Sequence, residues 1–173
     1  MKEQLALDFN PKPAAHLVVR DLGYSDEERS MALHFGKLIF DEAKLTRKSL
    51  MNREWDETRS AEFFDNRKDG ADIFCSVAEK DGEPVGIMAG CVFPSHIFTG
   101  NVAYDLFLYV LPEHRGSLIA KYLLQRYEDW AMTKDVLEIG FGIISNINAD
   151  RTGKLAERLG YQFVGSNYIK EIV

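Results

Sequence analysis

The sequence has few residues of the kinds that bind metals or form disulfides. It has two cysteines and four histidines among 173 residues, and the histidines lack the close spacing that zinc sites use. We therefore expect no metal site. Cys75 and Cys91 lie within apolar, strand-like runs, so we interpret them as buried thiols of a cytoplasmic protein.

Long apolar runs and an excess of positive charge are also missing. No apolar run approaches the roughly 20 residues that span a bilayer, and the N-terminus lacks the basic and then apolar order of a secretory signal. The formal net charge of −6 argues against a protein that wraps nucleic acid. We expect neither a membrane nor nucleic acid as a partner. The length and the mixed composition fit one globular domain.

An N-terminal arm precedes the regular part of the chain. Residues 1–15 contain Pro11 and Pro13 and sustain neither a helical nor a strand period, so we expect one domain over residues 16–173. Within the arm, QLALDF at residues 4–9 is similar to the Gln-x-x-Leu-x-Phe peptide that docks into the bacterial sliding clamp. An amphipathic tail that packs on its own domain explains this segment equally well.

Hydrophobic periodicity predicts both helices and strands after the arm. Ser25 and Glu28 have the spacing of a capping box, and Asp81-Gly82 tolerates the positive φ that a tight hairpin needs. Gly160 can end the last helix in the left-handed conformation. The expected elements are strand 16–22, helices from 25 and within 43–67, hairpin strands on both sides of 81–82, strand 101–111, helix 116–132, strand 136–145, helix 149–161 and one or two closing strands within 162–172.

The turn between strand 101–111 and helix 116–132 is a candidate anion site. The first turn of a helix has main-chain N–H groups without an intrahelical acceptor, and the helix dipole is positive there. Arg115 adds a positive charge beside these groups, and Gly116 allows a phosphate to approach the backbone. Taken alone, one arginine and one glycine are more often a plain connection between two elements.

The order of elements and the motif PEHRGSLIA together resemble the GCN5-related N-acetyltransferases over residues 16–172. In that family, an Arg or Gln, two free positions, a Gly, one free position and a Gly or Ala bind the pyrophosphate of acetyl-coenzyme A (acetyl-CoA) through main-chain amides. This pattern falls on Arg115 to Ala120, with Leu118 at the central glycine. The amides can still donate if Leu118 has a helical φ. PEHRGSLIA and ADRTGKLAERLGY also resemble the subset of the family found in phages and mobile elements.

The resemblance implies a mixed α/β (α+β) fold with about four helices. Its sheet would be mostly antiparallel, with one parallel pair of strands that splays apart to admit the cofactor. Acetyl-CoA would be the cosubstrate, and an amine, either a small molecule or a protein lysine, would be the acceptor. The residues implied for cofactor binding are Leu108, Tyr109, Val110, Arg115, Gly116, Ser117, Leu118, Ile119, Ala120, Asn146, Asn148 and Arg151.

The amine would attack the thioester directly, so the reaction needs a base and an acid rather than a covalent nucleophile. Asp105 is the candidate base, because burial within an apolar strand would raise its pKa. Alternatively, Asp105 caps a neighbouring loop or pairs with a cation. In the family, a tyrosine often acts as the general acid that protonates the leaving thiolate, and Ala156 stands at its position here. The thiolate then leaves unaided, catalysis has been lost, or another hydroxyl serves, with Tyr109, Ser145, Tyr161 and Tyr168 as the candidates.

The acceptor would be selected by residues 25–67. An acidic rim there would favour a cationic amine, although a solvated helical face explains the same residues. The rival to an enzyme is a regulatory or interaction protein that binds acetyl-CoA with weak turnover or none, and its arm could tether it to the clamp. Either protein could form an oligomer. The acidic residues are Asp41, Glu42, Glu54, Asp56, Glu57 and Glu62.

Overall fold

The computed structural model describes residues 16–67, 72–143, 145, 147–165 and 168–170. The N-terminal arm with its segment 4–9 and the predicted cofactor ligand Asn146 lie outside these residues.

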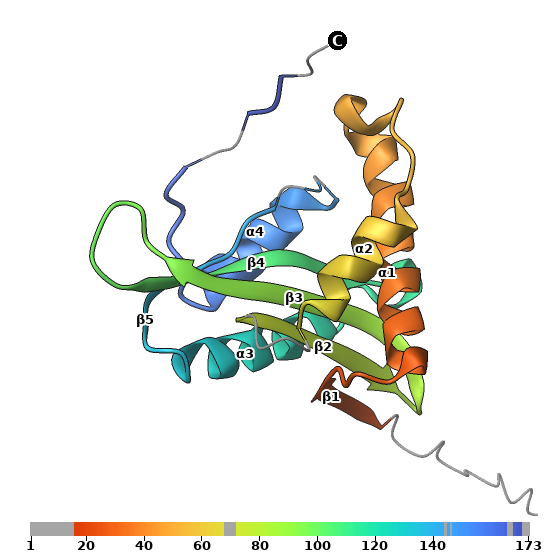
Figure 1. The fold of residues 1–173 in the computed structure, drawn as a ribbon, viewed down its shortest axis with the longest axis horizontal. Helices are drawn as coiled ribbons and strands as arrows, with labels where there is room; N and C mark the ends of the chain where they lie inside the picture. Colours follow the sequence, from red (N-terminus) through yellow and green to blue (C-terminus); the bar gives the residue numbers. More distant parts are fainter. Residues whose placement is uncertain (1–15, 68–71, 144, 146, 166–167, 171–173) are drawn as a thin grey trace, which may run out of the picture.

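One five-stranded sheet organises the chain, with its strands in sequence order (Figure 1). Its first four strands are antiparallel, and the fifth runs parallel to the fourth. This mixed sheet confirms the predicted fold class. The predicted hairpin is also confirmed, because Asp81 and Gly82 have φ values of 54° and 87° between its strands. The strands are β1 (Leu17–Asp21), β2 (Ile73–Lys80), β3 (Glu83–Pro94), β4 (Asn101–Val110) and β5 (Val136–Gly140).

Helices cover both faces of the sheet, and the sheet separates the hydrophobic core into two clusters of side chains (Figure 1). Side chains alternate along β3, so that Ile87 and Ala89 pack with the first two helices, whereas Met88 packs against the third. Val85 also packs against the third helix, because the register between β2 and β3 shifts at this residue. The helices are α1 (Asp26–Thr46), α2 (Glu57–Asp65), α3 (Ile119–Met132) and α4 (Ala149–Arg158), with short 3₁₀ turns η1 (Lys48–Leu50) and η2 (Pro112–His114).

Local signals set the ends of the helices. The Ser25 side chain accepts a hydrogen bond from the Glu28 N–H at 3.2 Å, as the capping box predicts. Gly160 has a φ of 97° just after α4, which confirms its role at the end of that helix. None of the helices in the described ranges combines the length and the apolar character needed to cross a bilayer.

The structure corrects three predicted boundaries near the ends of elements. Helix α3 begins at Ile119 rather than 116, because Gly116 has a φ of 84° and cannot be helical. Strand β5 ends at Gly140 rather than 145, where its pairing with β4 stops. The closing strands are not formed in 162–165 and 168–170, where Phe163 and Tyr168 are 73% and 95% exposed. An alternating apolar pattern makes a strand only where a neighbouring edge accepts its hydrogen bonds.

Candidate active site

The parallel strands β4 and β5 form a fork. They pair from Asn101 to Tyr104 on β4, and their described residues are unpaired beyond that point. The fork coincides with a bulge, because Phe107 lies opposite Ala89 and Asp105 lies opposite Gly90, which leaves Leu106 without a partner. The bulge bends β4 at the place where it loses its neighbour. The second half of β4 therefore has one edge directed toward an open cleft.

Main-chain groups of β4 face this cleft. The Leu111 N–H donates to the Val85 carbonyl oxygen at 3.0 Å, on the β3 side. Because alternate residues of an antiparallel strand direct both main-chain groups to the same side, those of Leu108 and Val110 face the fork. There the Val110 carbonyl oxygen accepts from Nε of Arg115 at 2.8 Å. The Leu108 N–H and C=O and the Val110 N–H are thus directed toward the cleft, where a ligand could pair with them.

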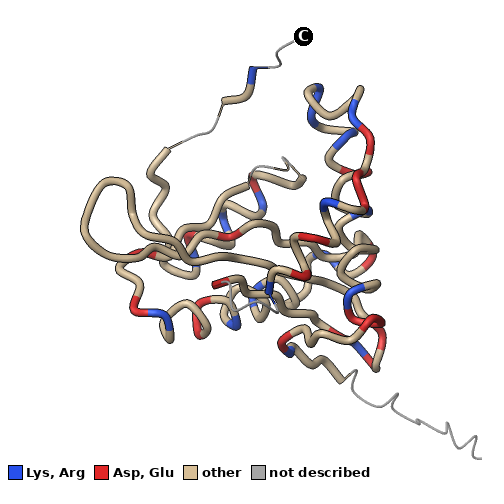
Figure 2. Tube along the Cα trace, in the orientation of Figure 1, with Lys and Arg blue, Asp and Glu red and all other residues tan. Residues whose placement is uncertain are grey.

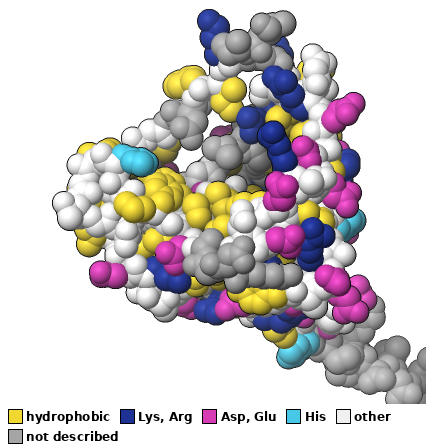
Figure 3. Space-filling view, viewed as in Figure 1, with side chains coloured by type: hydrophobic (Ala, Val, Ile, Leu, Met, Phe, Trp, Pro, Cys, Tyr) yellow, Lys and Arg dark blue, Asp and Glu magenta, His cyan; other side chains and the backbone are white. Residues whose placement is uncertain are grey.

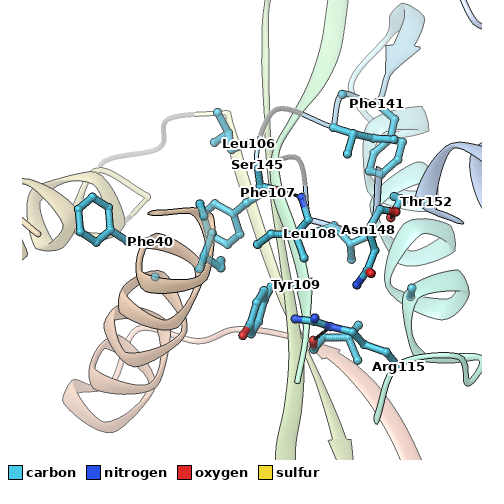
Figure 4. Close-up of a pocket in the computed structure, with 18 of the residues that line it drawn as sticks. Phe40, Leu106, Phe107, Leu108, Tyr109, Arg115, Phe141, Ser145, Asn148 and Thr152 are labelled. Carbon is cyan, nitrogen blue, oxygen red and sulfur yellow. Dashed lines mark hydrogen bonds between the residues drawn. The ribbon is translucent and has the colours of Figure 1, made fainter. Parts of the chain in front are cut away.

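A cavity of about 820 Å³ fills the fork, which is within the usual size range of small-molecule sites. Its walls come from β4, from α1 and α2 on one side, and from α4 and the loop before α3 on the other (Figure 4). Figure 3 shows the hollow, with hydrophobic side chains across its floor and basic side chains along the side of α1. The predicted site residues in its lining are Leu108, Tyr109, Val110, Arg115, Gly116, Ser117, Ala120, Asn148 and Arg151.

The loop before α3 has the backbone that the anion-site prediction requires. Gly116 has a φ of 84°, and Leu118 has a φ of −81° and a ψ of −1°, so the condition on Leu118 is met. The Leu118 side chain is 56% exposed and lies outside the cavity lining, as does Ile119. A Cβ on Gly116 would lie 2.6 Å from Nη2 of Arg151. The Arg151 guanidinium thus lies directly against the bare backbone of the loop.

Arg115 is held by a partner that sequence reasoning missed. Its Nη1 and Nη2 donate to Oε1 and Oε2 of Glu42 at 2.7 and 2.6 Å, and the Tyr109 hydroxyl donates to Oε2 at 2.9 Å. The hydrogen bonds from Arg115 lower the pKa of Glu42, whereas burial and Glu42 raise the pKa of Tyr109 to about 12. The Arg115 charge is therefore neutralised within the protein. One feature of the sequence could have indicated this contact. Glu42 lies three residues after Ile39, so it falls on the apolar side of the helix that faces the protein interior.

Asp105 lies at the branch point of the fork. Its Oδ1 accepts a hydrogen bond at 2.6 Å from the N–H of Gly142, which follows β5. Burial raises the pKa of Asp105 to about 6, against the lowering effect of the Gly142 hydrogen bond. Gly142 lines the cavity, whereas Asp105 lies outside its lining. This geometry favours the alternative in which Asp105 caps a loop, because the carboxylate joins the two diverging strands.

The remaining predicted residues divide into one that faces the cavity and two that do not. Asn148 has a φ of 48°, and its side chain makes no capping bond to α4 and points into the cavity (Figure 4). Tyr161 packs on Phe141 at 6.0 Å outside the lining, and burial raises the pKa of its hydroxyl. Tyr168 is 95% exposed and also lies outside the lining.

The formally charged side chains of the described cavity lining are all Lys or Arg and therefore of one sign, positive. Both signs occur along α1 and α2 (Figure 2), but no Asp or Glu belongs to the described lining. The acidic rim expected at residues 25–67 therefore does not face the cavity. Within the described ranges, no group of His, Cys, Asp or Glu is placed to hold a metal ion. The charged side chains of the lining are Arg47, Arg59, Arg115, Arg151, Lys154 and Arg158.

Comparisons with known proteins agree with this geometry. The model of the acetyltransferase (GNAT) family matches residues 40–161, which is most of the chain. No match is found among curated proteins. The aminoglycoside N-acetyltransferase AAC(6')-Iy, solved in complex with CoA, has a TM-score of 0.70 and 13% identity, and the alignment covers 92% of this chain and 96% of that one. A ribosomal-protein-alanine N-acetyltransferase from Brucella melitensis biovar Abortus 2308 has a TM-score of 0.64 and 20% identity, with 90% and 99% covered.

The chain therefore belongs to the GNAT family and is an acetyl-CoA-dependent acetyltransferase. The likeness to the solved structures, at these identities, concerns the fold. The residues that line the fork fit the cofactor class, because a ligand there meets main-chain donors of β4, the left-handed backbone of Gly116 and the Arg151 guanidinium.

Proposed function

We propose that the protein transfers an acetyl group from acetyl-CoA directly to a primary amine bound at the fork. The amine nitrogen forms a bond to the thioester carbonyl carbon, the carbon–sulfur bond breaks, and the sulfur leaves as a thiolate. The proton lost by the nitrogen passes to water, and the thiolate takes up a proton from solvent. The observation that carries this proposal is the edge of β4 that faces the fork at Leu108 and Val110.

Each part of the cofactor has a matching group in this proposal. The pyrophosphate lies against the main-chain amides between Gly116 and Ala120, with Arg151 as the neighbouring cation. The pantetheine arm pairs with Leu108 and Val110 and meets the Asn148 amide. A donor aimed at the thioester oxygen stabilises the charge that develops there by about 3 kcal/mol. Arg115 positions the loop through Glu42 rather than contacting the phosphates itself.

The role that we assign to Asp105 is to hold the fork. Its carboxylate is already engaged with Gly142 and lies outside the cavity lining, so the alternative of a loop cap has the better support. In this proposal the acceptor amine enters the cavity already unprotonated, so no protein base is needed to activate it. No carboxylate belongs to the described lining, which is consistent with transfer of the proton to water.

Among the four hydroxyls considered for the leaving group, Ser145 has the best support. It lines the cavity, and its Oγ accepts from the Ile147 N–H at 3.3 Å while its own proton has no acceptor in the described structure. The Tyr109 hydroxyl already donates to Glu42. We assign to Ser145 a hydrogen bond that stabilises the leaving thiolate.

Turnover of acetyl-CoA with a panel of amines tests this function. The full chain is mixed with acetyl-CoA and each amine, and both the free thiol and the mass of the acetylated amine are followed. We expect thiol release that depends on the amine and matches the acetylated product. Tight binding of acetyl-CoA without turnover would favour the regulatory alternative.

Two further predictions concern partners and stand apart from the reaction. Docking of residues 4–9 on a sliding clamp is tested by binding of purified clamp to the full chain and to its Phe9→Ala variant. Oligomer formation is tested by the sedimentation of the purified protein. Loss of clamp binding in the variant is the expected result if the arm is a docking peptide.

A further inference from the structure

One wall of the cavity is aromatic. Phe40 of α1 packs on Trp55, which lies just before α2, with ring centroids 5.9 Å apart, and Phe64 of α2 packs against Phe107 of β4 at 6.4 Å. Trp55 lies over Gly36, since a Cβ there would be 2.7 Å from Cη2 of the indole. An apolar surface of aromatic rings thus extends from α1 to the bulge of β4. It can accept a hydrocarbon or aromatic group next to the fork.

The same wall carries a cation for which the described residues supply no partner. Arg47 follows directly after α1, lines the cavity and has its Nε buried without a hydrogen-bond partner in the described structure. A buried N–H donor without an acceptor is costly, because it has lost water and gained nothing in exchange. The Nη1 and Nη2 groups of Arg47 also have no acceptor in the described structure but are not buried, so an acid group on a ligand in the cavity would accept hydrogen bonds from them.

Arg47 belongs to the acceptor side of the cavity. Glu42 reaches the loop before α3, and Arg47 lies five residues further along the chain, roughly 7 Å along the helix axis. The preceding residue, Thr46, donates from Oγ1 to the Ser145 carbonyl oxygen at 3.0 Å, so this end of α1 is tied to the segment beyond β5. The phosphate loop has its own cation in Arg151.

We infer that the acceptor is an amine that carries an apolar or aromatic body and a carboxylate, for which a free hydrophobic amino acid is the simplest example. This inference rests on the proposed function. The carboxylate pairs with Arg47, the body lies on Phe40, Trp55 and Phe107, and the amine reaches the bulge of β4. Polyamines and aminoglycosides fit poorly, because the described lining is basic and offers no carboxylate to a polycation.

A matched pair of ligands without an amine tests the acid site independently of turnover. The affinities of the full-length protein for 3-phenylpropionate and 3-phenylpropanamide are measured by calorimetry. We expect the carboxylate to bind about tenfold more tightly or better, as a hydrogen-bonded ion pair predicts. Arg47→Gln should abolish this preference and leave the affinity for acetyl-CoA unchanged. Lys48→Gln, which removes the same charge from the exposed next residue, should retain the preference.

Acetyl transfer is then measured with L-phenylalanine and with spermidine. Turnover of L-phenylalanine whose KM rises about tenfold in Arg47→Gln supports the inference. Equal affinity for the two phenyl ligands, or spermidine as the better acceptor, overturns the inference while the proposed function stands. An Arg47→Gln variant that loses acetyl-CoA affinity instead assigns Arg47 to the cofactor and also overturns it. Binding of 3-phenylpropionate without any acetyl transfer supports the acid site and contradicts the proposed function.

Discussion

The two walls of the cavity are made of different kinds of chemical group. The wall at the fork presents main chain, with Leu108 and Val110 on β4 and the left-handed Gly116 in the loop before α3. The wall on α1 and α2 presents side chains, chiefly aromatic rings and the Arg47 guanidinium.

This difference separates what the fold supplies from what this particular sequence supplies. Main-chain donors depend on strand geometry, so Leu118 can replace a glycine as long as its φ remains helical. Side chains of the helical wall carry their chemistry themselves, and a single substitution changes it. We therefore expect variants at the fork to alter the reaction of every acceptor alike, and variants of the helical wall to change the ranking of acceptors.

The largest effect is expected at Asp105. Asp105→Leu removes the acceptor of the Gly142 N–H, so the strands should shift and kcat should fall about a hundredfold for every amine. Asp105→Asn keeps an oxygen acceptor and should retain turnover within about threefold, because an amide can still bond the N–H. The measurement is kcat for two unrelated amines across pH 5 to 9. A hundredfold loss in Asp105→Asn, together with loss of a limb near pH 6, would make Asp105 the general base.

Asp105→Asn should also stabilise the folded protein at neutral pH. The pKa of Asp105 is raised from 3.8 to about 6 in the folded state, so the native protein binds its proton more tightly than the unfolded chain does. This group therefore lowers stability as pH rises from about 4 to 6, and the full cost is present at pH 7. Asp105→Asn should raise the free energy of unfolding by about 3 kcal/mol at pH 7. Urea denaturation should show a higher free energy of unfolding for Asp105→Asn at pH 7 and no difference near pH 3.5. An equal increase at both pH values would contradict the raised pKa of Asp105.

Two glycines with the same backbone conformation test whether the loop before α3 binds the cofactor. Gly116 and Gly160 have φ values of 84° and 97°, so an alanine at either should cost about 1 kcal/mol of stability. Only at Gly116 would the new Cβ meet the Arg151 guanidinium, whereas Gly160 has open space around it. We expect Gly116→Ala to weaken acetyl-CoA binding about tenfold, through the displaced cation. Calorimetry with acetyl-CoA checks this, and equal affinities in the two variants would exclude the loop from the site.

Features that depend on neighbouring residues could be predicted from the sequence. The Ser25 cap, the Asp81-Gly82 turn and the left-handed Gly160 each follow from the φ or the side-chain oxygen that a local geometry needs. The backbone of the loop before α3 was predictable for the same reason, because the left-handed φ of Gly116 and the helical φ of Leu118 depend on consecutive residues.

Features that depend on distant contacts could not be predicted. The Arg115–Glu42 ion pair joins residues 73 positions apart, and it exists because α1 lies across β4. The hydrogen bond from the Gly142 N–H to the Asp105 carboxylate likewise requires β4 and β5 to separate at one particular residue. The acidic residues of 25–67 looked like a rim because helical periodicity gives the spacing of faces but not which face meets the cavity.

The smallest effect is expected at Ser145, and it tests whether the fork also assists the leaving group. Ser145→Ala removes the hydroxyl assigned to the thiolate but leaves the carbonyl that accepts from Thr46. Because a thiolate is already a good leaving group, we expect kcat to fall only about threefold, with the KM for acetyl-CoA unchanged. Ser60→Ala is the matched control, since this hydroxyl also lines the cavity but already donates to the Asp56 carbonyl oxygen. Equal kcat values in the two variants would mean that the thiolate departs without help from the protein. A rise in KM confined to Ser145→Ala would instead place its hydroxyl on the bound cofactor.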